Sequence, residues 1–309
     1  MGIYLTIGTF DGVHLGHQKI IRTTIAQSLK RGLKSVLIYF PIPPKFYFSG
    51  EYSDSLITLP QEREELFANF RIGEMKSLAF NSGLASMTPE IFLDEILLAG
   101  RRVQGICVGR DFAFGKDRSG NIEFLREQCM GRGIDLKVMS FVRHKGRKIS
   151  SSLIRGFLKS GEIENAGKCL SRPYCVSGRV IKGSGIGRKL GFATANVDSD
   201  PLKILPPGVF AAKVGLGNET YFGVANVGRR PTISPFNKRL LLETHILDFS
   251  KMIYGRTLSV ELLKRIRGEK KFSGTEFLQR QIIEDVRFAR KYFAASSLSP
   301  NSSVGIREL

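Results

Sequence analysis

The hydrophobic positions in the first half of the chain alternate between strand-like and helix-like patterns. Residues 3–8 (IYLTIG) and 35–40 (SVLIYF) are short apolar runs typical of buried strands. Between them, Ile21, Ile25 and Leu29 lie four positions apart, which predicts one apolar helical face. The order helix, glycine, strand recurs at 89–112 and 121–142. We therefore predict an α/β doubly wound, mainly parallel sheet, with ligands at the carboxyl ends of its strands.

The pattern changes after Arg172 and Pro173. Short apolar segments at 174–181, 208–216, 220–228, 240–249 and 257–267 now alternate with Gly, Pro and Asn turns, which is typical of an antiparallel barrel or sandwich. One helix is predicted at 151–170, before the change. A last helix follows the strands, with Ser273 and Glu276 as a capping box. We predict one domain at residues 1–170, a barrel domain with a closing helix at 171–295, and a disordered tail at 296–309.

The charge of the chain favours anionic partners. The sequence has 47 Lys and Arg against 28 Asp and Glu, a formal net charge of +19. These cations are spread along the chain, so charge alone does not choose among phosphorylated metabolites, nucleic acid and acidic membranes. No two of the four cysteines form a CxxC motif. No apolar run is long enough to span a bilayer. We expect a cytoplasmic protein without a membrane partner.

The stretch GTFDGVHLGH at residues 8–17 carries the first candidate chemistry. A strand that enters a glycine-rich turn and then a helix exposes backbone amides that bind anions. His14 and His17, two of only four histidines, lie three positions apart in this turn. An imidazole donates a hydrogen bond to phosphate oxygen, and when protonated it stabilises charge at phosphorus. The alternatives are a metal pair, which needs further ligands, and two core histidines.

A second stretch, ISSSLIR at 149–155, also suits an anion. Ser150 and Ser151 precede a predicted helix that carries Arg155, so hydroxyls, helix terminus and guanidinium are grouped. A simple serine N-cap is the alternative interpretation.

These stretches resemble a known family. GTFDGVHLGH is similar to the HxGH signature of nucleotidylyltransferases, which have a Rossmann-like fold. Together with VGRDFAFGKDRSG (108–120), ISSSLIR and the second domain, it resembles bacterial bifunctional riboflavin kinase/FAD synthetases over nearly the whole chain. The resemblance implies that His14, His17 and Arg155 are catalytic. It also implies an ATP site and a flavin site in the first domain. The ATP-site residues would be Gly8, Phe10, Asp11, Gly16, Ser150 and Ser151, and the flavin-site residues Asp111, Phe112, Phe114 and Gly115.

In the first domain, the chain departs from the family pattern at two places. The usual Phe-x-Pro-His-Pro turn is replaced by residues 40–44, FPIPP, so only Phe40 and Pro44 match. In ISSSLIR the family commonly has Thr and Arg where Ser152 and Leu153 stand. Without the resemblance, the phenylalanines at 112 and 114 are more typical of a core than of ligand contacts.

The second domain contains a glycine-punctuated loop at 178–197, GRVIKGSGIGRKLGFATANV. Its GxGxG at 183–187 is a weak signal, equally typical of a plain turn. Arg188 adds charge for phosphates, and Thr194 and Asn196 offer hard oxygen ligands of the kind that phosphate-bound Mg²⁺ accepts. The loop resembles the ATP loop of riboflavin kinases, which implies ATP binding by Gly183, Gly187 and Arg188. Ala193 replaces the proline of the family's Pro-Thr-Ala-Asn motif.

Glu243 lies within the apolar segment RLLLETHILDF. A mid-strand carboxylate is costly there unless it is paired or used chemically, and a salt-bridged glutamate is the alternative. The resemblance implies that Glu243 is the general base that takes the proton of a primary alcohol.

The predicted function is FAD synthesis in two steps. Riboflavin and ATP give FMN and ADP in the second domain, and FMN and ATP give FAD and pyrophosphate in the first. The enzyme is thus an ATP-dependent riboflavin kinase and FMN adenylyltransferase, with Mg²⁺ accompanying ATP. We expect small-molecule substrates, no nucleic acid, and a monomer or weak oligomer. The alternatives are a riboflavin kinase with an impaired adenylyltransferase domain, an RNA-adenylylating enzyme, and a basic nucleic-acid-binding protein.

Overall fold

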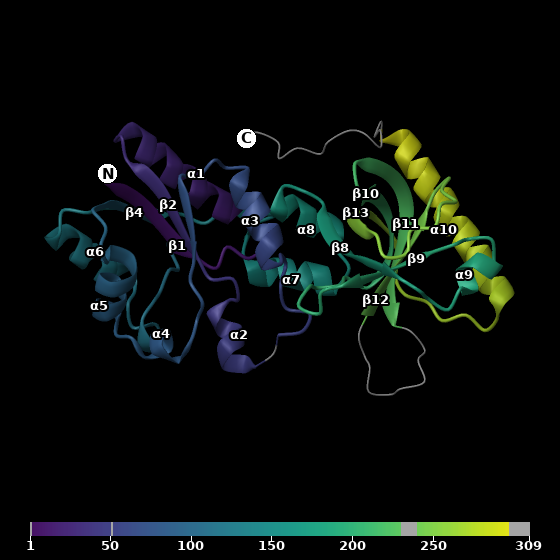
Figure 1. Cartoon of the computed structure of the whole chain (residues 1–309), viewed down its shortest axis with the longest axis horizontal. Helices are drawn as coiled ribbons and strands as arrows, with labels where there is room; N and C mark the ends of the chain where they lie inside the picture. Colours follow the sequence, from purple (N-terminus) through teal and green to yellow (C-terminus); the bar gives the residue numbers. More distant parts are fainter. Residues whose placement is uncertain (1, 51, 230–239, 297–309) are drawn as a thin grey trace. The chain divides into compact units, whose positions relative to one another are not determined.

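The computed structural model describes residues 2–50, 52–229 and 240–296, and its contacts divide the chain into two compact units. The first unit consists of residues 1–52 and 56–151, and the second of residues 53–55 and 152–309 (Figure 1). The tail predicted to be disordered lies, except for Ser296, outside the described residues.

The first unit is built on a five-stranded parallel sheet. Its strand order is β3-β2-β1-β4-β5, and every pair is parallel. The strands are β1 (Ile3–Gly8), β2 (Lys34–Tyr39), β3 (Glu74–Ser77), β4 (Val103–Gly109) and β5 (Asp135–Met139). The chain steps outward in both directions from β1, so the predicted doubly wound topology is confirmed.

Helices cover both faces of this sheet (Figure 1). On one face, α1 (Leu15–Lys30) and α3 (Pro60–Ala68) pack on Leu37 and Tyr39. On the other face, α4 (Ser82–Ser86), α5 (Pro89–Phe92), the π-helix Leu93–Leu98 and α6 (Ile122–Gly131) contribute to the larger core. The remaining elements of this unit are α2 (Pro44–Ser49), a 3₁₀ turn (Lys116–Arg118) and the hairpin β6 (Arg143–His144) and β7 (Arg147–Lys148).

The buried face of α1 differs from the predicted one. Ile21 is fully buried, but Leu29 is 75% exposed, and the buried positions are Gln18, Ile21, Thr24 and Ser28. Seven residues are nearly two helical turns, so Ser28 lies over Ile21, whereas an eight-residue step turns Leu29 about 80° away. The hydroxyls of Thr24 and Ser28 donate hydrogen bonds to the backbone carbonyls of Ile20 and Ile25, which lets these polar residues face the sheet.

The second unit contains a closed six-stranded barrel in the order β10-β11-β12-β9-β8-β13, with all pairs antiparallel. The strands are β8 (Tyr174–Ile181), β9 (Ala195–Ser199), β10 (Gly208–Leu216), β11 (Glu219–Arg229), β12 (Leu240–Ile246) and β13 (Thr257–Arg267). Closure leaves no unpaired edge, because β13 pairs with both β8 and β10. Of the two interpretations, sandwich and barrel, the barrel is confirmed. Strand β9 lies in the segment that the sequence presented as a loop.

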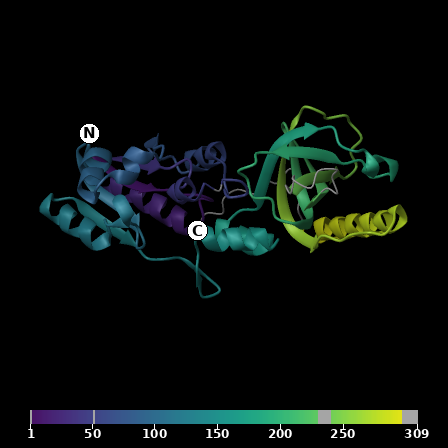
Figure 2. The ribbon, with the colours of Figure 1, turned by 90° about the horizontal axis from the view of Figure 1, so that it is seen from below.

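The closing helix α10 (Thr275–Ala295) runs along the outside of the barrel (Figure 2). Ala289 and Phe293 pack on Val209, Ala211 and Val224, and the rings of Phe222 and Phe293 stack with centroids 4.0 Å apart. The predicted capping box is wrong, because Gly274 occupies the N-cap and no side chain caps the helix. Instead, Arg267 holds the helix through a bidentate ion pair with the buried carboxylate of Asp285.

The single helix predicted at 151–170 is two helices, α7 (Ser151–Lys159) and α8 (Ile163–Leu170). Gly161 lies between them in the left-handed region, with φ +72°, and a Cβ there would meet the carbonyl oxygen of Pro207 at 2.6 Å. Both helices belong to the barrel unit after Ser151, whereas the sequence interpretation placed the domain boundary at residue 170.

Two further features concern membrane-spanning helices and the cysteine thiols. Within the described ranges, none of the helices combines the length and the apolar character that crossing a bilayer requires. All four cysteines are free thiols, and burial raises the pKa of Cys107 and of Cys129 to about 11.

Candidate functional site

The two predicted imidazoles lie together at the start of α1. His14 is the N-cap residue, and its Nδ1 accepts a hydrogen bond from the backbone N–H of His17 at 3.3 Å. The two rings are stacked, with centroids 3.6 Å apart and planes inclined by 16°. The edge of Phe10 contacts His17 at a centroid distance of 5.3 Å. His14 is thus both a buried, structurally bonded residue and half of a paired imidazole surface at a helix N-terminus, where anions are favoured.

The backbone that carries these rings is unusual. Phe10 (φ 47°), Gly12 (φ 86°) and Val13 (φ 42°) all lie in the left-handed region, which is strained for a bulky or β-branched residue. Gly16 packs closely on His14, because a Cβ there would lie 3.1 Å from Cε1 of that ring. Gly8 ends β1 and packs against the ring of Phe10. The glycines therefore shape the turn itself.

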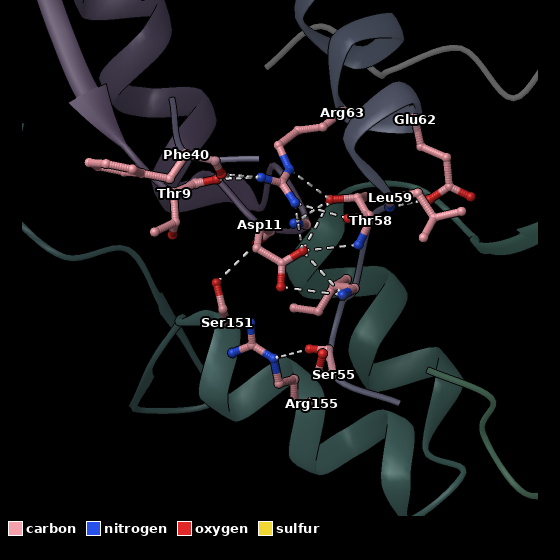
Figure 3. A network of polar contacts seen from close by, with 12 residues as sticks. Thr9, Asp11, Phe40, Ser55, Thr58, Leu59, Glu62, Arg63, Ser151 and Arg155 are labelled. Atoms are coloured by element: carbon pink, nitrogen blue, oxygen red, sulfur yellow. Dashed lines mark hydrogen bonds and ion pairs between the residues drawn. The ribbon is translucent and has the colours of Figure 1, made fainter. Parts of the chain in front are cut away.

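Asp11 points away from solvent. Its carboxylate is fully buried and accepts hydrogen bonds from the backbone N–H groups of Ile57 and Thr58, at 3.1 and 3.0 Å (Figure 3). The guanidinium of Arg63, also fully buried, lies 3.5 Å from the same carboxylate. The acidic side chain is thereby used to fix the turn.

The second predicted phosphate clamp begins at the N-terminus of α7. Ser151 is the first residue of this helix, and its hydroxyl donates to the backbone carbonyl of Asp11 at 3.0 Å. Ser150 is half-buried just before it. Arg155 lies one turn further on, is buried, and donates from Nε to the carbonyl of Ser55 at 2.7 Å within the second unit. Ser151 and Arg155 thus both bind backbone carbonyl groups that lie near the start of α7.

The four residues predicted to line a flavin differ in exposure. Asp111 is exposed and forms an ion pair with Lys148 at 2.6 Å. Phe114 is only 6% exposed and packs in the core against Phe92, and Phe112 stacks on it at 5.3 Å. Gly115 has φ +72°, and a Cβ there would collide with the backbone of Pro89. Asp111 and Phe112 are the members of this set whose side chains reach the surface.

A separate group of aromatic rings is exposed after β2. Tyr47 and Phe48 belong to α2, and both form edge contacts with Phe80 at 5.3 and 5.6 Å. Phe48 is 69% exposed, an unusual state for a large apolar ring. The proline-rich turn leads into this helix, with Pro43 as N-cap and Pro44 as the first helical residue. The carboxyl end of β2 therefore presents an aromatic surface.

In the barrel unit, the glycine loop folds back over the predicted metal ligands. A Cβ on Gly183 would lie 2.2 Å from the amide nitrogen of Asn196, and one on Gly187 would lie 2.5 Å from the carbonyl oxygen of Phe192 and 3.4 Å from the hydroxyl of Thr194. Asn196 is consequently buried at 8% exposure, while Arg188 of the short helix α9 (Ile186–Lys189) is exposed. The loop brings two glycines, a threonine and an asparagine together.

Glu243 joins this group through the sheet register. It lies directly opposite Asn196 on β9 and Asn226 on β11, so the three polar side chains form a row across adjacent strands. The alternating neighbours Leu242 and Thr244 point into the buried interior, which places Glu243 on the outer face. On that face, the Nδ1 of His245 lies 2.8 Å from the carbonyl oxygen of Ala193, next to Thr194. The barrel thus sets the carboxylate of Glu243 opposite Asn196, one of the two residues predicted to bind the metal.

Within the described ranges, no group of three or more His, Cys, Asp or Glu side chains is arranged to hold a metal ion. A magnesium ion at Thr194 and Asn196 would need phosphate oxygens to complete its shell.

Comparison with known proteins decides the family. The FAD synthetase family model matches residues 1–153, and the riboflavin kinase family model matches residues 170–293. A protein of Buchnera aphidicola named bifunctional riboflavin kinase/FMN adenylyltransferase is 36% identical over 94% of this chain and 93% of its own length. This chain belongs to the bifunctional riboflavin kinase/FMN adenylyltransferase family. Relatives of the same name from Escherichia coli K12 (34% identical, covering 94% of this chain and 93% of theirs) and Bacillus subtilis (35%, 94% and 92%) agree.

A solved structure shares the fold of this family member. It is a Streptococcus pneumoniae crystal structure described as a macrolide-efflux protein, with a TM-score of 0.84 and 30% identity, covering 94% of both chains.

Three features of these sites escaped the sequence analysis. Arg63 and Thr58 bind the turn before α1 from 46 to 54 residues away. The exposed ring of Phe48 and the bond from His245 to Ala193 were also missed. One signal for Arg63 was present: it lies four residues before the buried Phe67, so a charged residue interrupts the apolar face of α3.

Proposed function

We propose that this chain synthesises FAD from riboflavin in two ATP-dependent steps, one in each unit. Family membership over both halves supports the pairing of a kinase with an adenylyltransferase. Both halves match their family models, so nothing favours the alternative of an impaired first domain. The observation that carries the adenylyl transfer is the stack of His14 on His17 at the N-terminus of α1.

In the barrel unit, Glu243 accepts the proton of the 5′-hydroxyl of riboflavin. The resulting alkoxide attacks the γ-phosphorus of ATP, so that an O–P bond forms as the bond to ADP breaks. The row formed by Glu243, Asn196 and Asn226 supports this role, because it orients a carboxylate beside neutral amides on the outer face of the barrel. Positioning and charge stabilisation, more than covalent chemistry, supply the rate.

The oxygens of Thr194 and Asn196 fit Mg²⁺, which prefers hard oxygen ligands. When bound with ATP, the ion neutralises charge on the phosphates. The glycine loop holds the Asn196 amide by direct packing of Gly183, and the bond from Nδ1 of His245 to the carbonyl oxygen of Ala193 fixes the backbone before Thr194.

In the first unit, a phosphate oxygen of FMN attacks the α-phosphorus of a second ATP, and pyrophosphate leaves. His14 and His17 donate hydrogen bonds to the phosphate oxygens, where negative charge increases during attack. The N-terminal amides of α1 add partial positive charge. The exposed rings around Phe48 suit the flat isoalloxazine, since they offer apolar faces at the carboxyl end of β2. The net charge of +19 suits these anionic substrates, and we propose a cytoplasmic enzyme without nucleic-acid partners.

Two variants test the division of labour. Purified protein is incubated with riboflavin, Mg²⁺ and ATP, and FMN and FAD are separated by chromatography. Glu243→Gln should abolish FMN formation but still convert supplied FMN to FAD, because the two steps use separate residues. His17→Ala should accumulate FMN and make little FAD. If both folded variants lost both activities, the assignment of one step to each unit would be wrong, and salt-sensitive RNA binding without ATP turnover would favour a nucleic-acid-binding protein.

A further inference from the structure

The turn that presents His14 and His17 is not stable by itself. Phe10 and Val13 have φ angles of 47° and 42°, and neither is a residue that tolerates the left-handed region well. Such backbone persists only where surrounding contacts determine it. Because Phe10 contacts the ring of His17, relaxation of this residue would move an imidazole.

A buried cluster supplies those contacts from outside the turn. The hydroxyl of Thr58 accepts a hydrogen bond from the backbone N–H of Gly12 at 2.8 Å and lies 3.2 Å from a carboxylate oxygen of Asp11 (Figure 3). The guanidinium of Arg63 donates from Nη1 to the carbonyls of Thr9 at 2.8 Å and Phe40 at 2.9 Å. These carbonyls follow the ends of β1 and β2, so the cluster joins both strand ends to the turn.

The guanidinium is suited to this position by its geometry. It also donates from Nη2 to the carbonyl of Thr58 at 3.0 Å and from Nε to its hydroxyl at 3.3 Å, so its donors point in fixed directions within one plane. Its charge is balanced by Asp11, 3.5 Å away. All three side chains are almost fully buried, at 3% exposure for Thr58 and none for the other two. They therefore act on the turn and do not touch a ligand.

We propose that Thr58 and Arg63 are positioning residues for adenylyl transfer, which hold the strained turn 9–13 so that His14 and His17 face the reacting phosphates. The proposal rests on the adenylyltransferase function proposed above for the first unit. It predicts that loosening the cluster lowers the rate of the chemical step more than it weakens substrate binding, because bound substrates then meet misplaced imidazoles.

Thr58 offers a matched pair of variants. Thr58→Val keeps the shape of the side chain but removes the hydroxyl that accepts the hydrogen bond from the Gly12 N–H, whereas Thr58→Ser keeps the hydroxyl. For FAD formation from FMN, Thr58→Val should lower kcat by about 10- to 100-fold, the loss expected for a displacement near 1 Å, with KM for ATP and FMN changed less than about threefold. Thr58→Ser should stay within about threefold of the parent protein. Arg63→Lys, which keeps the charge but not the planar fork, should fall between the parent protein and Arg63→Met.

Two internal controls separate positioning from loss of structure. FMN formation by the barrel unit of the same preparation should be unchanged in every variant. The chain has four histidines, so their imidazole NMR signals can be assigned by substitution. In Thr58→Val the signals of His14 and His17 should shift, while that of His245 should not.

Three results would overturn the proposal: a parental kcat in Thr58→Val, an equal loss in Thr58→Ser, or unchanged His14 and His17 signals in Thr58→Val. If the parent protein itself made no FAD, the proposed adenylyltransferase function would fail instead. The imidazole signals would then still decide whether Thr58 positions the two rings.

Discussion

The substitution Gly183→Ala tests whether the glycine loop of the barrel unit holds Asn196 in place. Gly183 does not lie in the left-handed region, so alanine is compatible with its backbone, and the effect comes from the added methyl group alone. That methyl carbon would lie 2.2 Å from the amide nitrogen of Asn196, 2.7 Å from its Cγ and 2.9 Å from its amide oxygen.

The size of the clash sets the expected effect. Ordinary van der Waals contact begins near 3.4 Å, so the methyl group and the amide must separate by a further 1.2 Å. Asn196 is buried and faces Glu243 across the sheet, so either the loop lifts or the amide leaves the position that suits Mg²⁺ and the carboxylate. A displacement near 1 Å at a reacting centre costs about 100-fold, or about 2.7 kcal/mol of transition-state stabilisation.

The assay follows FMN formation from riboflavin at several Mg²⁺ and ATP concentrations. Gly183→Ala should lower kcat/KM about 100-fold and require more Mg²⁺ for half-maximal rate, while FAD formation from supplied FMN stays at the parental level. The control is Gly156→Ala in α7, where a Cβ meets nothing within 4 Å. A Gly183→Ala protein that kept more than a third of the parental kcat/KM would refute the argument that this contact holds Asn196.

Other predictions test the exposed rings, the thiols and the closing helix. Phe48→Ala should raise KM for FMN in FAD formation about threefold to tenfold through lost ring contact, whereas Phe277→Ala, which removes another exposed ring on α10, should not, as steady-state kinetics will show. At pH 8 the buried thiols of Cys107 and Cys129, whose pKa is about 11, stay protonated and should react with a disulfide reagent only as the pH approaches that value. Cys175 is only partly buried, so Cys175→Ser should remove the fast-reacting thiol. Asp285→Ala leaves Arg267 without its bidentate partner and should destabilise the barrel unit by about 3 kcal/mol, seen as a lower urea midpoint for kinase activity; an unchanged midpoint would mean that the pair does not anchor α10.

The periodicity of local elements was sufficient for most of the architecture. Apolar runs at 3–8 and 257–267 correspond to β1 and β13, since a strand buried on one or both faces must be apolar in a fixed pattern. Helix details were predicted less well. Leu29 matched a four-residue repeat but is exposed, because an eight-residue step turns it away from Ile21. Thr24 and Ser28 face the sheet instead, since their hydroxyls donate to backbone carbonyls. The helix predicted at 151–170 included Gly161, whose positive φ divides α7 from α8.

By itself, the sequence determined the two-part organisation, the family and the positions of the imidazoles and of Glu243, because these follow from short segments whose spacing is fixed by covalent connectivity. Only the tertiary structure decided what surrounds them. It placed Arg63 and Thr58 on Asp11, set Asn196 opposite Glu243, and buried Phe114 while exposing Phe48. These contacts join residues far apart in the chain. Which buried donor meets which acceptor depends on how the strands pair, and a local sequence pattern does not determine that pairing.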